Sequence, residues 1–286
     1  MDNFVKRIKH KGSTGSITRV LVHIILILAS ASTIGPLVWI FITAFKPREE
    51  VFSKIPQWIP KEVTFSNFTE IFTILPVGLY YINTIIIVGG ILAVQLITIT
   101  LAAYAFARLK FKGRDLLFIL LLTQLMLANQ SVILPNYLTI SNLKLLNTKL
   151  AIMLPYFGSA YGTFLLRQTF KTIPKELEDA ATMDGCSSFR FLWQIAVPLA
   201  KPTIIVFSVI SLLYHWSEFF WPLIVTDTPK ARPLTVGLGI FAMQAEGGAE
   251  WTLLMAFTLL VIVVPLTMFV VLQRRIINSF MRTGFK

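Results

Sequence analysis

The stretch Tyr80-Tyr-Ile-Asn-Thr-Ile-Ile-Ile-Val-Gly-Gly-Ile-Leu-Ala-Val-Gln-Leu-Ile-Thr-Ile-Thr-Leu-Ala-Ala-Tyr-Ala-Phe-Ala107 contains no charged side chain. A helix needs roughly 20 apolar residues to cross the hydrocarbon core of a bilayer. Because the core offers no water to the backbone, a helix is the form that satisfies every N–H and C=O group of such a segment. This stretch therefore predicts a transmembrane helix and places the chain among all-α membrane proteins.

The rest of the chain has the same character. Hydrophobic residues make up 55% of the sequence and charged residues 14%, and the mean hydropathy is +0.73, which is too apolar for a soluble domain of this length. Six segments qualify as spans or nearly so. They are Val20–Phe45, Tyr80–Ala107, Leu116–Leu143, Leu150–Leu166, Pro202–Thr226 and Trp251–Gln273. The third is long, and we expect Pro135 to mark where it leaves the membrane; the fourth is short.

The 26 Lys and Arg residues predict the orientation. An even number of spans puts both termini on one side, and the tails, the loop after Ala107 and the loop around Ile173 together hold 18 of the basic residues, whereas the opposite side holds 8. The positive-inside rule then places both tails and the Ile173 loop in the cytoplasm. The net charge of +12 has the same origin and indicates contact with anionic membrane lipid, not with nucleic acid.

The predicted domains follow from these spans. Residues 1–19 form a cytoplasmic basic tail, 20–79 the first transmembrane helix and an external loop, 80–273 the core transmembrane domain with a cytoplasmic loop at 167–201, and 274–286 a cytoplasmic tail. The first span has no small-residue cleavage site, so we expect it to be retained and not removed as a signal peptide. Cys186 is the only cysteine, which excludes an internal disulfide bond.

The cytoplasmic loop contains Ile173-Pro-Lys-Glu-Leu-Glu-Asp-Ala-Ala-Thr-Met-Asp-Gly185, which predicts a short surface helix. Thr172 is a candidate cap, Pro174 suits a first turn and Gly185 ends the helix. Carboxylates gather near the positive end of the helix dipole. The small side chains of Ala180 and Ala181 would let a partner backbone approach closely. The alternative is an ordinary capped loop helix. The candidate docking residues are Pro174, Glu176, Glu178, Asp179, Ala180, Ala181, Asp184 and Gly185.

Few residues in the chain carry recognisable chemistry. The sequence has no phosphate-binding G-x-x-x-x-G-K-[ST] loop, and its three histidines lack metal-ligand spacing. We therefore expect no catalytic residue, no metal site and no bound cofactor. Glu218 is the only carboxylate inside a predicted span, and an ionisable residue there is a functional candidate by default. The alternative is an interfacial residue in an aromatic belt between Trp216 and Trp221.

Polar residues within the spans are candidates for a translocation pathway. The candidates are Asn83, Gln124, Asn129, Tyr214, Trp216 and Glu218, with Gln95 and Gln130 as further polar positions. Each of them could equally form a hydrogen bond to a neighbouring helix.

Together these segments resemble a known family. The Ile173–Gly185 stretch, followed by Ile195-Ala-Val-Pro-Leu-Ala-Lys-Pro202, resembles the EAA loop of binding-protein-dependent ABC importer permeases. Phe164-Leu-Leu-Arg-Gln168, His215-Trp-Ser-Glu-Phe-Phe-Trp-Pro-Leu223 and Leu272-Gln-Arg-Arg275 resemble its carbohydrate-uptake branch, the maltose-type second permease subunit. Asp179 replaces the first letter of the EAA triplet, and Ser217 stands where the branch often has Asn.

The resemblance implies a type I importer permease fold with six transmembrane helices, in a bacterial or archaeal cell (inner) membrane. It also implies a heterodimer with a second permease subunit, two ATPase subunits that bind ATP and Mg, and an extracellular solute-binding protein that delivers a sugar. In this family the EAA helix is the coupling helix, which docks into a cleft of the ATPase.

The external segment Asp227–Glu250 contains several glycines, which predict a flexible loop. The resemblance implies that this loop reaches into the binding protein through Met243, Gln244, Glu246 and Gly247. The alternative is an ordinary linker.

Glycerol-3-phosphate uptake is the alternative within the family, because its permeases share the pattern. A phosphate ester would favour cationic residues in the cavity, and the predicted spans place none there. An ion-coupled secondary transporter or a channel would need a constellation such as paired carboxylates inside the membrane, and the predicted spans hold only Glu218. A polytopic membrane enzyme would need a catalytic cluster at an interface, and the only cluster is the acidic residues of the Ile173 loop, which sit as helix caps.

Overall fold

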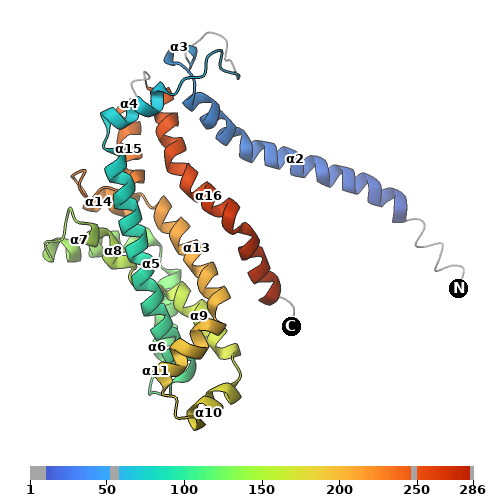
Figure 1. The fold of residues 1–286 in the computed structure, drawn as a ribbon, viewed down its shortest axis with the longest axis vertical. Coiled ribbons are helices and arrows are strands. Elements are labelled where there is room, and N and C mark those ends of the chain that lie inside the picture. Colours follow the sequence, from blue (N-terminus) through green and yellow to red (C-terminus); the bar gives the residue numbers. More distant parts are fainter. Residues whose placement is uncertain (1–10, 52–57, 246–249, 284–286) are drawn as a thin grey trace, which may run out of the picture. The chain divides into compact units, whose positions relative to one another are not determined.

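The computed structural model describes residues 11–51, 58–245 and 250–283, and all its regular elements in these ranges are helices (Figure 1). The chain separates into two compact units, residues 1–71 with 245–260, and residues 72–244 with 261–286. The N-terminal tail before Lys11 lies outside the described residues.

The first unit begins with α2 (Lys11–Ala44), followed by α3 (Arg48–Val51) and α4 (Ser66–Ile74). Residues Thr18–Ala44 of α2 are apolar and long enough to cross a membrane, as the sequence predicted. The buried amide of Asn67 donates hydrogen bonds of 2.9 Å to the carbonyls of Ala44 and Lys46. This side chain therefore holds α4 against the end of α2.

The second unit is built around α5 (Val77–Arg108), a continuous helix that matches the predicted Tyr80–Ala107 span. Its inner face packs most extensively on α9 (Ala160–Thr172) and α13 (Lys201–Ser217). The helix α16 (Trp251–Thr283), whose residues 251–260 belong to the first unit and the rest to the second, contains the third continuous candidate span, Trp251–Val271. The remaining helices of this unit are α6 (Arg114–Thr123), α7 (Ile133–Asn142), α8 (Lys149–Met153), α10 (Lys175–Met183), α11 (Ser188–Phe191), α12 (Val197–Leu199), α14 (Phe220–Val225) and α15 (Leu234–Ala245).

The third and fifth predicted spans are broken in the structure. The third divides into Arg114–Met126 and Gln130–Asn142, which meet at an angle of 103°. The chain is extended at Leu127 and Ala128, so the break precedes Pro135, which lies inside the first turn of α7, where proline is tolerated. Pro135 is therefore not the cause of this break. The fifth span ends as a helix at Ser217, and α14 follows after a short extended break.

The predicted fourth span, Leu150–Leu166, is not one helix. It comprises α8, a 3-10 turn at Leu154–Tyr156, and the first half of α9, whose N-cap Ser159 accepts a hydrogen bond of 3.0 Å from the N–H of Gly162. The described helices give three spans by length and composition, or five if each bent pair crosses once.

The segment before α16 also differs from the prediction. Residues Leu234–Ala245 form the helix α15, although Gly237 and Gly239 predicted a flexible loop. A Cβ atom at Gly237 would lie 2.5 Å from the ring of Tyr80, and one at Gly239 would lie 2.3 Å from the ring of Phe219. These glycines therefore permit close packing and do not act as hinges.

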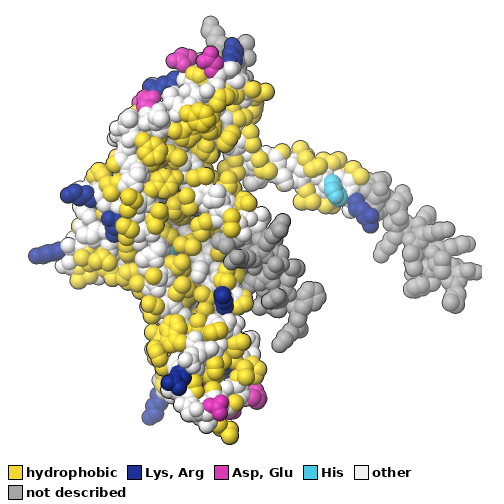
Figure 2. All heavy atoms as spheres, in the orientation of Figure 1, with side chains coloured by type: hydrophobic (Ala, Val, Ile, Leu, Met, Phe, Trp, Pro, Cys, Tyr) yellow, Lys and Arg dark blue, Asp and Glu magenta, His cyan; other side chains and the backbone are white. Residues whose placement is uncertain are grey.

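Hydrophobic side chains cover most of the face of the second unit shown in Figure 2, while acidic side chains gather at the end that carries α10. Several large apolar side chains of α5 are exposed, and those of Ile82, Ile85 and Ile97 are more than half exposed. An apolar surface of this extent is expected where lipid replaces water.

Candidate functional site

A cavity of about 490 Å³ lies within the second unit. Its walls come from α5, the bent α6–α7 region, the chain before α9, and the break between α13 and α14. The described polar or aromatic residues that line it are Gln95, Gln124, Gln130, Asn136, Tyr156, Ser159, Tyr161, Phe207, Ser211, Tyr214, His215, Glu218, Phe220 and Trp221. The broken helices therefore form much of this site, as expected where irregular backbone borders a cavity in a membrane protein.

Glu218 occupies the break between α13 and α14. Its backbone is extended, and its carbonyl accepts a 2.7 Å hydrogen bond from the hydroxyl of Thr235. The carboxylate accepts a hydrogen bond of 3.4 Å from the backbone N–H of Trp221 in the first turn of α14. Neighbouring segments thus fix both the break and the direction of the carboxylate.

Gln95 is the centre of a buried hydrogen-bond network at the cavity wall. Its Oε1 accepts from the hydroxyl of Ser211 at 2.6 Å, and its Nε2 donates to the carbonyl of Tyr156 at 2.7 Å. Its Nε2 also lies 3.4 Å from Nε2 of His215. This contact places the imidazole of His215 beside the amide of Gln95. The network joins α5, α13 and the chain before α9.

The cavity includes part of the predicted pathway. Gln124, Tyr214 and Glu218 line it, together with Gln95 and Gln130. The side chain of Asn129 lies outside the described part of the chain.

Asn83 and Trp216, two of the predicted pathway residues, are not among the residues that line this cavity. Asn83 is fully buried and donates to the carbonyls of Pro229 and Arg232, at 3.3 and 2.9 Å. The indole N–H of Trp216 donates to the carbonyl of Val261 at 3.1 Å. Both side chains hold neighbouring segments together, which was the alternative that the sequence left open.

The sequence did not identify several of the lining residues. Asn136, Ser159 and Tyr161 lie beside helix breaks, and His215 lies within α13, where Gln95 reaches it. For Asn136, Ser159 and Tyr161, the sequence did offer a signal: polar side chains next to a Pro or Gly within an otherwise apolar stretch. No signal in the sequence alone pairs His215 with Gln95, because they are 120 residues apart.

The helix α10 forms where the sequence predicted it, with different capping. Pro174 is the N-cap residue, and the hydroxyl of Thr172 donates to the carbonyl of Thr169 within α9, so Thr172 does not cap α10. Gly185 has a φ of +76° and ends the helix. The N–H groups of Gly185 and Cys186 donate to the carbonyls of Thr182 and Ala181, which is the Schellman pattern.

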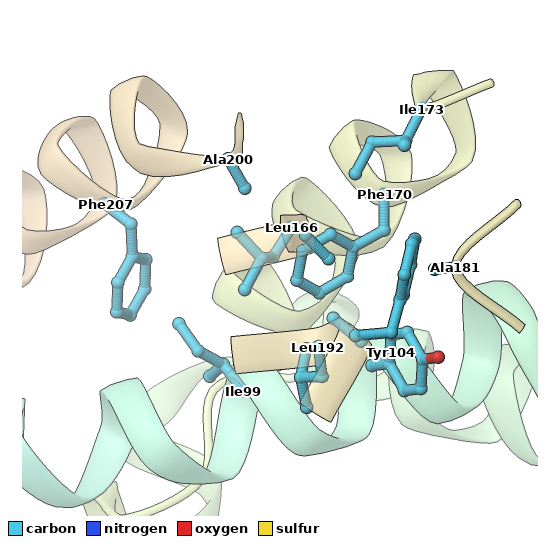
Figure 3. Packing of buried hydrophobic residues seen from close by; sticks show 12 residues of the cluster. Ile99, Tyr104, Leu166, Phe170, Ile173, Ala181, Leu192, Ala200 and Phe207 are labelled. Atoms are coloured by element: carbon cyan, nitrogen blue, oxygen red, sulfur yellow. The ribbon is translucent and has the colours of Figure 1, made fainter. Parts of the chain in front are cut away.

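The two alanines of α10 face opposite environments. Ala181 is only 8% exposed and packs in a core cluster with Tyr104, Phe170 and Ile173 (Figure 3). Its small side chain therefore serves the internal packing of the chain. The exposed face of α10 carries Glu176, Leu177, Asp179, Ala180 and Met183, and Asp184 and Gly185 are exposed at its end.

The predicted contact with a binding protein is only partly within the described chain. Met243 and Gln244 are exposed near the end of α15. Glu246 and Gly247 lie outside the described residues. Among the described residues, no group of three or more His, Cys, Asp or Glu side chains is placed to hold a metal ion.

Comparisons with known proteins agree with this architecture. Residues 95–283 match the family described as "Binding-protein-dependent transport system inner membrane component". The chain is 32% identical over 260 residues to the sn-glycerol-3-phosphate transport system permease protein UgpE of Yersinia pestis, covering 88% of this chain and 92% of that protein. It is 28% identical over 266 residues to the diacetylchitobiose uptake system permease protein NgcG of Streptomyces coelicolor, covering 92% of this chain and 88% of that protein.

The fold is also found in a solved structure. A chain of a bacterial ABC transporter involved in the import of the acidic polysaccharide alginate superposes with a TM-score of 0.83 at 21% identity, covering 92% of this chain and 98% of that chain. The matched motifs, the extent of the sequence similarity and this shared fold lead to one conclusion: the chain belongs to the family of binding-protein-dependent transport system inner membrane components, the permeases of ABC importers.

Proposed function

We propose that this chain is one of two permease subunits in an ATP-driven importer of a sugar or oligosaccharide, which an extracellular solute-binding protein delivers. The proposed class of substrate rests on one observation, the set of side chains that line the cavity. Amide and hydroxyl groups from Gln124, Asn136, Ser159 and other residues offer both donors and acceptors. Such a lining suits a ligand with many hydroxyl groups.

Aromatic side chains in the same cavity support this assignment. Tyr156, Tyr161, Tyr214, Phe220 and Trp221 all contribute to the lining. Aromatic rings offer flat apolar surface to the C–H faces of a sugar ring, while Tyr hydroxyl groups bind its polar edge. A pocket with apolar walls and a few placed polar groups is the usual form of a small-molecule site.

Glycerol-3-phosphate is the second candidate, because a relative at 32% identity is named for its transport. The described lining residues include the carboxylate of Glu218 and contain no Lys or Arg. A phosphate ester would therefore meet a like charge on this subunit, which disfavours binding. It would need its cations from the second permease, so the cavity favours a neutral carbohydrate.

The proposed assembly places both termini and α10 in the cytoplasm and gives the chain six spans, with α9 as the short fourth one. Two partner ATPase subunits bind ATP and Mg, and the exposed face of α10 docks on one of them. Their closure on ATP moves α10, and the attached helices rock so that the cavity opens outward. The difference in ATP affinity between the two states limits how far this equilibrium shifts.

The test is uptake by the complete complex in proteoliposomes supplied with its binding protein. Radiolabelled neutral mono- and oligosaccharides and sn-glycerol 3-phosphate are offered in turn. We expect uptake and stimulated ATP hydrolysis with a neutral carbohydrate. Uptake of the phosphate ester alone would show that the substrate class is wrong.

A cavity variant tests the site itself. Asn136→Ala removes an amide that lines the cavity, and we expect it to lower uptake about tenfold with basal ATP hydrolysis unchanged, since lost hydrogen bonds to a ligand typically cost on that order. Thr139→Ala is the matched control, because Thr139 lies on the same helix and its hydroxyl donates to the carbonyl of Pro135. Equal uptake by the two variants would remove Asn136 from the site.

A further inference from the structure

Arg108, the last residue of α5, joins three elements at the end of the second unit that carries α10. Its Nη1 lies 3.2 Å from Oε2 of Glu178 on α10. Its Nη2 donates to the carbonyl of Phe170, in the last turn of α9, at 2.7 Å, and also to the carbonyl of Ile173, which caps that helix. One guanidinium group thus binds α5, α9 and α10 to one another.

The chemistry of each contact suits arginine. The last carbonyls of a helix have no partner within the helix and carry the negative end of its dipole, so a cation stabilises the end of α9. The planar guanidinium offers several donors in a fixed geometry, whereas a lysine ammonium is a compact point charge. The side chain of Arg108 is 10% exposed and that of Glu178 is 26% exposed, so solvent screens the pair only in part.

The contact with Glu178 is on the same face of α10 as the buried Ala181. Residues three apart on a helix lie on one face, so this inner face holds α10 to the core through one ion pair and one apolar contact. The outer face, with Asp179, Ala180 and Met183, remains exposed. Met183 is 89% exposed. A partner protein bound to the outer face that displaced α10 would therefore load the ion pair between Glu178 and Arg108 on the inner face.

The helix α5 links this contact to the cavity. It is continuous from Val77 to Arg108, and Gln95, the centre of the network around His215, lies on it. At 1.5 Å per residue, the distance along the helix from Gln95 to Arg108 is about 20 Å. A displacement of Arg108 along the helix axis would therefore move Gln95, at the cavity wall, by nearly the same distance.

We propose that Arg108 is the positioning residue that makes α10 move as one body with α5 and α9, so that ATP hydrolysis is coupled to movement of the cavity. This inference rests on the proposed function, in which α10 docks on an ATPase. Without the ion pair, α10 would keep its docking surface but would transmit its movement to α5 poorly.

The first measurement is the number of substrate molecules transported per ATP hydrolysed by the complete complex in proteoliposomes. Arg108→Gln and Glu178→Gln each remove the ion pair, and we expect the ratio to fall about tenfold while ATP hydrolysis continues. Arg108→Lys keeps the charge, and its ratio of transport to ATP hydrolysis should lie between those of these variants and that of the wild type. Arg114→Gln is the matched control, because Arg114 pairs with its neighbour Asp115 and not with α10.

The second measurement is local and does not depend on transport. Cys186 follows α10 directly, is half-buried and packs against the same core cluster. If the ion pair holds α10 in place, the rate of maleimide modification at Cys186, followed by peptide mass spectrometry, should rise about fivefold in Arg108→Gln and Glu178→Gln, because local opening exposes the thiol. It should not change in Arg114→Gln.

The outcomes separate the two proposals. Faster modification together with a lower transport ratio supports the role of Arg108. An unchanged modification rate in Glu178→Gln, which leaves both carbonyl contacts of Arg108 in place, or an unchanged transport ratio in both variants, overturns it. Failure of the proposed function is seen on the wild type, as the absence of carbohydrate-stimulated ATP hydrolysis, and the modification rates still test the contact.

Discussion

At the scale of single residues, Gly237 shows how closely the helices of the second unit approach. A Cβ atom there would lie 2.5 Å from two ring atoms of Tyr80, whose side chain is buried. Gly237→Ala gains up to about 1 kcal/mol of helix propensity, but overpacking a buried contact costs about 1–3 kcal/mol. We expect a net loss of stability, measured as a lower midpoint of thermal unfolding of the purified subunit in detergent.

The control for this prediction is Gly89→Ala. Gly89 is exposed on α5, and a Cβ atom there would have no neighbour within 4 Å. The alanine should leave the midpoint unchanged or raise it. If both variants unfolded at the same temperature as the wild type, α15 would not pack against Tyr80 as the structure describes.

At the scale of elements, the helix α10 has one face in the core of the chain and one face exposed. Ala181→Leu adds bulk next to Tyr104 and Phe170, so we expect it to destabilise the subunit by about 1–3 kcal/mol in thermal or denaturant unfolding. Ala180→Leu adds the same bulk on the exposed face. It should leave the stability of the isolated subunit unchanged and weaken its association with the ATPase subunits.

Two measurements on each variant separate the faces. Unfolding of the isolated subunit reports on the core, and co-purification of the ATPase subunits reports on docking. If Ala180→Leu bound the ATPase subunits like the wild type, the exposed face of α10 would not be the docking surface.

At the scale of the whole molecule, the orientation in the membrane is open to a direct test. Cys186 is the only cysteine of the chain and lies just after α10. A membrane-impermeant maleimide should label it in inverted vesicles and should fail to label it in sealed right-side-out vesicles. Labelling of the detergent-solubilised chain is the control that the half-buried thiol can react.

The opposite labelling pattern would reverse the topology. The cytoplasmic position of α10 that the excess of Lys and Arg predicts would then be wrong, and ATPase subunits could not dock on α10. The description of the cavity and of the fold would not change, because neither depends on which end of the protein faces the cytoplasm.

The sequence by itself determined the features that depend on local pattern. Long apolar stretches without charge predicted the continuous helices α2, α5 and α16, because a helix satisfies its own backbone wherever it lies. The position of α10 and its end at Gly185 followed from local turn chemistry, since a positive φ favours glycine. The family followed from the spacing of the motifs around the same helix.

Only the tertiary structure decided the features that depend on distant neighbours. The helix break at Glu218 is held by a later segment, because the hydroxyl of Thr235 donates a hydrogen bond to the carbonyl of Glu218. Ala180 and Ala181 are the same residue type in sequence, and packing alone buries one of them. Asn83 and Gln95 both lie in α5, yet one binds a loop and the other the cavity network, because a polar side chain inside a membrane protein takes its role from whichever partner the fold brings within hydrogen-bond distance.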